Sequence, residues 1–297
     1  MAHNHDASNI YPHGHEAQLK IHFSAPAFTV PTLDDINKKY NEGGKIHEWA
    51  GVKIVRLSPT LVVKFGSRVA VAEAKNMRFV LQHSQNIPVP EVFAYCTYGP
   101  ISRDIDDYGS LFDTYIFMSY VDGQTLDIAW ESYDNEAKAR VSSQLQKYLD
   151  DLRSINEATY IGSSDYGPVL DPILASYSFQ GPFSSEEDFS NTIINAYLHK
   201  APKQHVKGFL AGMVSQKNHR IVFTHGDFRP QNIMVKDGEV TGLIDWELSG
   251  WYPEYWEFAK SLCIWRWQND WGDYLMQILR PYYPEYAFHS FVSSILW

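Results

Sequence analysis

The sequence predicts an α+β protein with two lobes: a small antiparallel β lobe that carries one helix, and a larger, mostly α-helical lobe. Two observations indicate this division. Up to about residue 118, segments rich in β-branched and aromatic residues alternate with turns, whereas apolar residues recur at helical spacing beyond the polar connection at 121–126. We expect four parts: a flexible N-terminal tail over residues 1–30, a first lobe over 31–118, a hinge over 119–123 and a second lobe over 124–297.

The first lobe is expected to contain several short strands. The stretch IHEWAGVKIVRLSPTLVVKF, residues 46–65, is rich in β-branched and aromatic residues, and Ser-Pro-Thr at 58–60 indicates a turn between two strands. Two further stretches, 92–98 and 113–121, have the same character. Because the strands are short and joined by turns, we expect them to form an antiparallel sheet.

One helix is expected inside this lobe, over residues 68–84. Glu73, Met77 and Val80 lie along one face of it at helical spacing. The following NIPVPEV ends the helix, because proline lacks a backbone N–H donor and favours extended backbone at the residue before it.

The second lobe is expected to contain helices over residues 133–155 and 184–200, with a loop-rich insert, 157–184, between them. The second helix opens with serines and acidic residues, which favour the positive end of a helix. An aromatic helical region, 251–297, ends the chain. The first helix carries an apolar stripe that consists of Val141, Leu145, Tyr148, Leu149 and Leu152.

The composition excludes some classes of partner. The formal net charge is −10, whereas nucleic-acid binding needs clustered Lys and Arg. No apolar run is long enough to span a membrane. Only Cys96 and Cys263 are present, so no disulfide framework is implied and a reducing compartment fits best. We therefore expect a cytoplasmic protein that has neither nucleic acid nor membrane as a partner.

The stretch FTHGDFRPQNIMVKDGEVTGLIDWE, residues 223–247, brings three oxygen-bearing side chains together. Asp-Gly at 237–238 between apolar segments is a strong signal of a tight hairpin. Asn232 then precedes the first strand and Asp245 follows the second, so both lie at the open end, and Asp227 lies in the loop that enters it. Each residue alone is typical of a turn or a helix cap, but the joint pattern predicts a functional site.

These residue types indicate a particular chemistry. Carboxylate and amide oxygens are the ligands that Mg²⁺ prefers, and proteins usually hold this ion with one or two groups together with substrate phosphates. A third carboxylate nearby, outside the ligand set of the metal, can orient and deprotonate a hydroxyl. Such a set of metal-binding oxygens and a separate carboxylate is typical of phosphoryl transfer, in which the protein positions the reactants and neutralises charge.

The stretch HGDFRPQN followed by IDWE resembles the signature of the aminoglycoside phosphotransferase and choline kinase superfamily, relatives of the protein kinases. LVVKFG, AEAKNMRFV, IPVPEV, FMSYVDGQTL and GWYPEYWEFAK resemble further blocks of fungal members, so the resemblance covers roughly residues 46–265. It implies a protein-kinase-like fold and transfer of the γ-phosphate of ATP, with Mg²⁺, to a hydroxyl of a small molecule. Asp227 would be the base, Asn232 and Asp245 would hold Mg²⁺, and His225 would support the loop.

The resemblance also implies a nucleotide-binding side. Lys64 in LVVKFG would pair with Glu73 and direct its ammonium at the α and β phosphates, whereas a strand lysine otherwise extends to solvent. In the hinge, the backbone of Ser119 and Val121 would contact adenine, with Met118 lining the pocket. The chain departs from the kinase pattern because it lacks a G-x-G-x-x-G phosphate loop and has a single glycine in EWAGVKI.

Arg229 lies two residues past the expected base. Protein kinases often carry a lysine at this offset, which contacts the transferring phosphate, so we expect Arg229 to do the same. A surface salt bridge is the competing interpretation.

The acceptor is expected to be an aminoglycoside-, choline- or sugar-like molecule. From residue 246 onward, tryptophans are interleaved with acidic residues: Trp246, Trp251, Trp256, Trp265, Trp267, Trp271 and Trp297 with Glu247, Glu254, Glu257, Asp270 and Asp273. A cationic acceptor is one hypothesis, because aromatic faces and carboxylates together can hold an ammonium. The alternative is that most of these tryptophan rings form the helical core.

Three other functions fit parts of the sequence. A protein kinase would need an activation loop, for which the few residues between IDWE and GWYPEYWEFAK leave no room. A catalytically silent, kinase-like nucleotide-binding module is the second alternative, although Lys64, Asp227, Asn232 and Asp245 are all present. A metal-binding protein is the third, built on four histidines of the expected tail: His3, His5, His13 and His15.

Overall fold

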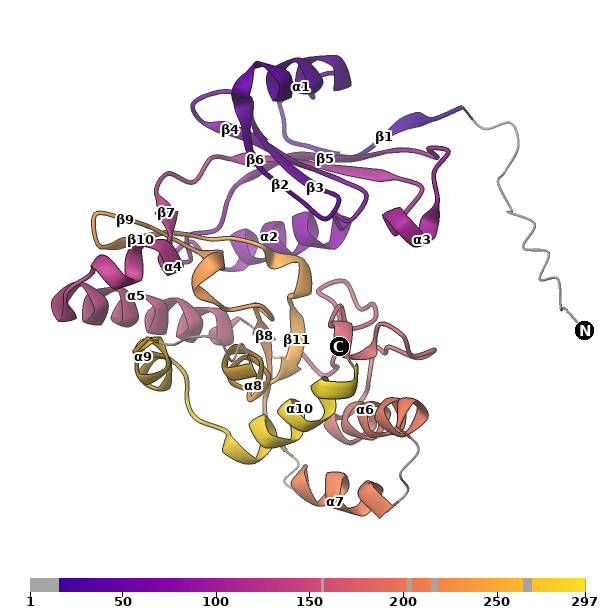
Figure 1. Cartoon of the computed structure of the whole chain (residues 1–297), viewed down its shortest axis with the longest axis vertical. Helices are drawn as coiled ribbons and strands as arrows, with labels where there is room; N and C mark the ends of the chain where they lie inside the picture. Colours follow the sequence, from indigo (N-terminus) through magenta and orange to yellow (C-terminus); the bar gives the residue numbers. More distant parts are fainter. Residues whose placement is uncertain (1–15, 156–157, 202–204, 215–217, 264–268, 297) are drawn as a thin grey trace, which may run out of the picture. The chain divides into compact units, whose positions relative to one another are not determined.

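The computed structural model describes residues 16–155, 158–201, 205–214, 218–263 and 269–296 (Figure 1). The chain forms two compact units: the first contains the chain up to Val71 and Val92–Tyr120, and the second contains Ala72–Glu91 and the chain from Val121 onward. The first unit is mainly sheet and the second mainly helix, which confirms the predicted α+β class. The four histidines of the expected tail, Trp265, Trp267 and Trp297 lie outside the described residues.

A six-stranded antiparallel sheet forms the first unit, in the order β1-β5-β6-β4-β3-β2. The strands are β1 (Gln18–Ser24), β2 (Lys45–Trp49), β3 (Val52–Arg56), β4 (Leu61–Gly66), β5 (Val92–Gly99) and β6 (Asp113–Ser119). They include the strands that the sequence predicts for the first lobe. Strand β1 lies within the stretch expected as a tail, so this part of the stretch instead forms a strand that pairs with β5.

A hydrophobic core joins this sheet to helix α1 (Leu33–Lys39). Ile36 of α1 is 1% exposed and belongs to the same cluster as Val63 and Phe65 of β4. Side chains alternate between the two faces of a strand. Lys64 therefore points away from this core, on the opposite face of β4, although its side chain is also buried. A short helix, α3 (Ile105–Tyr108), lies between β5 and β6.

The second unit contains α2 and all elements from β7 onward. Its strands are β7 (Gln124–Thr125), β9 (Ile233–Lys236) and β10 (Glu239–Leu243), in the sheet order β10-β9-β7, with a separate pair of β8 (Ile221–Thr224) and β11 (Gly250–Pro253). Its helices are α2 (Val71–His83), α4 (Leu126–Ala129), α5 (Asn135–Ser154), α6 (Glu186–Lys200), α7 (His205–Met213), α8 (Trp256–Cys263), α9 (Trp271–Ile278) and α10 (Tyr283–Leu296).

Helix α2 was expected within the first lobe, but its contacts place it in the second unit from Ala72 onward. The ring of Phe79 lies 4.6 Å from that of Phe223 on β8 and 5.7 Å from that of Trp251 on β11. Val80, one residue further along, is fully buried. These aromatic contacts anchor α2 on the β8–β11 pair.

The expected helices of the second unit are confirmed. Asp134 caps the start of helix α5, and its side chain accepts a hydrogen bond from the backbone N–H of Ala137. Ser185 caps the start of helix α6, and its hydroxyl accepts the backbone N–H of Asp188. The apolar stripe of α5 faces the core, with Val141, Leu145, Leu149 and Leu152 buried and Tyr148 partly buried.

A buried ion pair lies in the core of the second unit. Lys260 Nζ of α8 is 2.6 Å from Asp171 Oδ2, and the indole N–H of Trp256 donates to the same oxygen at 3.1 Å. Burial alone would raise the pKa of Asp171, but Lys260 and His289 hold it below its usual value. Burial lowers the pKa of His289 to about 4, against the effect of Asp171, which raises it. The ion pair connects the insert to α8, and His289 of α10 lies within electrostatic range of both of its charges.

Among the helices of the described residues, none combines the length and the apolar character needed to cross a bilayer.

Candidate active site

The hairpin β9–β10 forms as the sequence predicts. Asp237 and Gly238 both have positive φ, 52° and 77°, which is the backbone of a type I′ turn. At the open end of the hairpin, Ile233 pairs with Leu243, and the N–H of Ile244 donates to the carbonyl of Asn232 at 3.0 Å. Asn232 and the start of the Asp245 segment are therefore held side by side.

The loop before β9, residues 225–232, carries the expected base and is called the Asp227 loop below. Asn232 Nδ2 donates to the carboxylate oxygen Oδ2 of Asp227 at 2.7 Å and to the Asp227 carbonyl at 2.9 Å. Both contacts use the amide nitrogen, which turns the Asn232 side-chain oxygen away from Asp227. Asp227 and Asn232, predicted to meet, are thus in direct contact.

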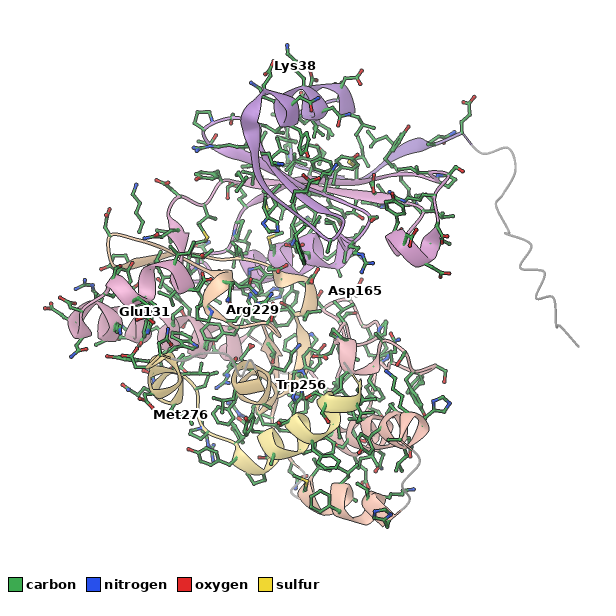
Figure 2. All side chains as sticks on the ribbon, in the orientation of Figure 1. Lys38, Glu131, Asp165, Arg229, Trp256 and Met276 are labelled. Atoms are coloured by element: carbon green, nitrogen blue, oxygen red, sulfur yellow. The ribbon has the colours of Figure 1, made fainter. Side chains whose placement is uncertain are left out.

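Arg229, which is labelled in Figure 2, also lies against Asp227. Its Nε is 3.0 Å from Asp227 Oδ2, but within the described part of the chain this N–H makes no hydrogen bond. The contact is therefore an ion pair without a hydrogen bond, because the Nε–H of Arg229 does not point at Oδ2 of Asp227. The side chain of Arg229 is 38% exposed, against 17% for that of Asp227, so the guanidinium borders solvent beside the proposed base.

The start of the Asp227 loop is held by a buried carboxylate that sequence reasoning did not single out for this role. Glu257 of α8 is 2% exposed. Its Oε2 accepts the N–H of His225 at 2.7 Å, and its Oε1 accepts the N–H of Gly226 at 3.1 Å. Such charge-assisted hydrogen bonds are short and strong. Glu257 therefore fixes the two residues that precede Asp227.

His225 connects the Asp227 loop to the segment that carries Asp245. Its Nε2 donates to the carbonyl of Ile244 at 3.1 Å, and its Nδ1 accepts the N–H of Asp227 at 3.2 Å. This pairing requires the ring proton on Nε2. His225 is 1% exposed, and its position agrees with the supporting role that the resemblance implies.

Three carboxylates converge beside this loop. One oxygen atom each from Glu73 of α2, Asp245 and Glu247 lies within 4.8 Å of the other two. Asp245 has left-handed backbone, with φ of 66°, a conformation that costs about 1–3 kcal/mol in a non-glycine residue and persists where the surroundings enforce it. From the sequence, Glu247 was not predicted to belong to this group, although Glu247 lies two residues after Asp245 in IDWE.

The residues expected to bind the nucleotide lie in both units. Lys64 of β4 is buried in the first unit and pairs in register with Ile54 and Ile116. Met118 and Ser119 end β6 in the same unit, whereas Val121 and Glu73 belong to the second. The expected Lys64–Glu73 pair would join the two units, and it stays a prediction.

The tryptophans from residue 246 onward that the structure describes form core, as the alternative interpretation predicted: Trp246, Trp251, Trp256 and Trp271 are 0–5% exposed. Most of the acidic residues between them have partners inside the protein. Glu254 pairs with Arg220, Asp270 pairs with Lys138, and Glu257 holds the Asp227 loop. The aromatic and acidic stretch therefore serves packing more than ligand binding.

Solved structures of aminoglycoside phosphotransferases share this fold. ADP-bound APH(2'')-Ib matches with a TM-score of 0.56 and 13% identity, over 90% of this chain and 91% of that chain. The ternary complex of streptomycin, ATP and APH(2'')-IIa matches with 0.53 and 14%, over 89% and 87%. A thermostable mutant of APH(4)-Ia, in ternary complex with AMP-PNP and hygromycin B, matches with 0.54 and 17%, over 84% and 83%. Among curated proteins, no match was found.

These likenesses show that the chain has a protein-kinase-like fold. A model of the phosphotransferase enzyme family matches residues 52–291, most of the chain. The chain belongs to this family, and it is an enzyme of the small-molecule kinase class.

Proposed function

We propose that the enzyme transfers the γ-phosphate of ATP, in the presence of Mg²⁺, to a hydroxyl group of a small molecule, with Asp227 as the general base. The contact between Asp227 and Asn232 carries this proposal. Because Asn232 and Arg229 both approach Oδ2 of Asp227, Oδ1 is the oxygen that can accept the proton of an acceptor hydroxyl. Solved relatives with ATP, AMP-PNP or ADP bound support a nucleotide as phosphate donor.

The residues present fit a magnesium ion. Asp245 and Glu247 offer hard carboxylate oxygens, with Glu73 within the same 4.8 Å, and the side-chain oxygen of Asn232 is turned away from Asp227. Such oxygen ligands suit Mg²⁺. When bound, the ion would neutralise charge on the phosphates. We propose Asp245 and Asn232 as its ligands, with Glu247 as a further carboxylate.

In the proposed mechanism, three residues of the Asp227 loop each have one task. Asp227 orients the acceptor hydroxyl and takes its proton as the oxygen forms a bond to the γ-phosphorus, while the bond from that phosphorus to the bridging oxygen of ADP breaks. Asn232 keeps the carboxylate in position through its two hydrogen bonds. Arg229 places positive charge at the solvent side of Asp227, where it would stabilise the transferring phosphate.

The acceptor is proposed to be a hydroxyl-bearing small molecule of aminoglycoside-, choline- or sugar-like chemistry. Streptomycin and hygromycin B are bound in solved relatives. Glu254, Glu257 and Asp270 are used inside the protein, which argues against these three carboxylates as the site of a cationic acceptor.

A mass-spectrometric screen tests the proposal. Purified enzyme, ATP and Mg²⁺ are incubated with panels of aminoglycosides, choline-like amines and neutral sugars, and a mass gain of one phosphate is measured. Asp227→Asn is the matched control. We expect at least one product that the control forms far more slowly. Nucleotide binding without any product would favour the silent module, and products from neutral acceptors alone would remove the cation hypothesis.

A further inference from the structure

A buried asparagine on α2 has no role in the site described above. Asn76 is 1% exposed, although a polar residue in a helix usually faces solvent. Its Nδ2 donates to the carbonyl of Trp246 at 2.9 Å and to the carbonyl of Ser249 at 3.1 Å. Its Oδ1 accepts from the hydroxyl of Ser164 at 2.7 Å. Both amide hydrogens and the carbonyl oxygen are therefore used.

The two carbonyls that Asn76 binds delimit one short turn, residues 246–249, which follows Asp245 directly and contains Glu247. Asn76 itself lies one helical turn after Glu73, and residues three apart lie on the same side of a helix. The amide thus connects the part of α2 that carries Glu73 to the turn that contains Glu247 and directly follows Asp245.

The turn is also connected to the Asp227 loop. The hydroxyl of Ser249 donates to the carbonyl of His225 at 2.7 Å, and the indole N–H of Trp246 donates to the carbonyl of Leu243 at 2.8 Å. Asn76 therefore belongs to a continuous set of buried hydrogen bonds that extends from α2 to the residues before the proposed base.

We propose that Asn76 is a positioning residue: it holds the 246–249 turn against α2 and thereby keeps Asp245 and Glu247, two carboxylates of the proposed magnesium site, in place. The inference rests on the proposed function, because it concerns the magnesium site named there. Without the amide, the carbonyls of Trp246 and Ser249 lose the N–H donor that connects them to α2, and Trp246 retains only the N–H of Ser249 within the turn itself. The turn can then move relative to α2, and Asp245 and Glu247 lose their fixed positions.

Direct binding of Mn²⁺, measured by electron paramagnetic resonance on the full chain without nucleotide, tests the inference. Asn76→Leu keeps nearly the same volume but removes all three hydrogen bonds. Residues that orient metal ligands typically change metal affinity about 10- to 100-fold when they are mutated. We expect a loss in this range for Asn76→Leu, at a temperature where circular dichroism shows the variant to be folded.

A matched control is the neighbouring residue on α2. Lys75 pairs at 2.7 Å with Asp165 of the insert, which is labelled in Figure 2, and the two side chains are 44% and 52% exposed. Lys75→Ala removes a contact between α2 and the insert without touching the 246–249 turn. Its affinity for Mn²⁺ is expected to stay within about threefold of the parent, as for exposed ion pairs that contribute little.

Two results would overturn the inference. If folded Asn76→Leu binds Mn²⁺ as tightly as the parent, Asn76 does not position the group, while the proposed function stands. If the parent binds no Mn²⁺ even after a non-hydrolysable ATP analogue is added, the metal ligands of the proposed function are wrong and the inference fails with them. Should Asn76→Leu not fold, Asn76→Ser, whose hydroxyl is too short to reach both carbonyls, replaces it with the same expected loss.

Discussion

Asn232 donates its side-chain N–H to the carboxylate of Asp227 at 2.7 Å, five residues earlier in the chain. The same nitrogen also binds the Asp227 carbonyl at 2.9 Å. One amide therefore holds both the backbone and the side chain of the proposed base. Its own oxygen is left for another partner, which explains why an asparagine, with one donor and one acceptor end, suits this position.

Asp227→Asn is expected to lower turnover by about two to four orders of magnitude, the usual contribution of a general base together with its positioning. The affinity for ATP should change little, because Asp227 is assigned to the acceptor. Turnover is measured as acceptor-dependent release of ADP, and nucleotide affinity by calorimetry. Turnover within about threefold of the parent would remove Asp227 from the role of base.

Arg229→Ala is expected to reduce turnover at least about tenfold, because charge aimed at a transferring phosphate stabilises the transition state more than the bound substrates. Arg229→Lys should restore part of the loss. If Arg229 forms only a surface ion pair with Asp227, both variants will retain the parent rate. Comparison of kcat with the KM for ATP distinguishes these outcomes.

Glu257→Gln is expected to lower turnover about 10- to 100-fold, because one of the two backbone N–H groups at 2.7 and 3.1 Å would then face an NH₂ group, and a small displacement of a positioned group can cost this much. Stability should fall by about 1–3 kcal/mol, as for a buried donor left unsatisfied. Urea denaturation and steady-state kinetics measure the two effects.

The control for Glu257 is Glu254→Gln. Glu254 precedes α8 and pairs with the exposed side chain of Arg220 at 3.3 Å. Exposed ion pairs contribute about 0–1 kcal/mol, so this variant should resemble the parent in both measurements. Equal effects from the two substitutions would mean that Glu257 has no specific role in holding the Asp227 loop.

Lys260→Met is expected to lower the free energy of unfolding by about 3–5 kcal/mol, because it leaves the buried carboxylate of Asp171 without its cation. Asp171→Asn combined with Lys260→Met should recover part of the loss, since the remaining amide carries no charge. Chemical denaturation of both variants measures this difference. A double variant less stable than Lys260→Met would contradict the interpretation that the loss comes from an unpaired charge on Asp171.

His289 predicts a pH dependence of stability. Its pKa in the folded protein is about 4, below the ordinary value of 6.5, because it is buried. The unfolded chain therefore binds the proton more readily between these values, so the stabilisation is complete above pH 6.5 and is lost as the pH falls toward 4. The loss is on the order of 3 kcal/mol. Asp171, whose pKa is lowered, acts in the same direction at lower pH.

His289→Asn removes this titration, so the free energy of unfolding of the variant should fall less between about pH 7 and pH 4 than that of the parent. Denaturant midpoints across this range provide the measurement. A parent and a variant with parallel pH profiles would show that His289 is not buried in its neutral form.

Some of this structure follows from local sequence. The turn at Asp237 and Gly238 needs positive φ at both residues, a requirement that Asp-Gly meets with little strain, so the hairpin and the approach of Asn232 to the Asp245 segment were predictable. The stripe of α5 was predictable from its period, because one face of a long helix must be buried.

Other features depend on partners far away in the chain. Asn76 and Glu257 are polar residues in helices, where such residues usually face solvent. Their burial is decided by carbonyl and amide groups more than thirty residues distant, at Trp246 for Asn76 and at His225 for Glu257. No periodicity or motif contains that information, which is why neither role was predicted.

The membership of α2 in the second unit has a practical consequence for dissecting the protein. A fragment that begins at Val121 would omit this helix, and with it the ring of Phe79 that covers Phe223 and Trp251. The aromatic surface uncovered in this way would favour aggregation. A circular permutant that fuses Ala72–Glu91 to the end of the chain would retain the helix, so autonomous folding of the larger unit is best sought in that rearranged polypeptide.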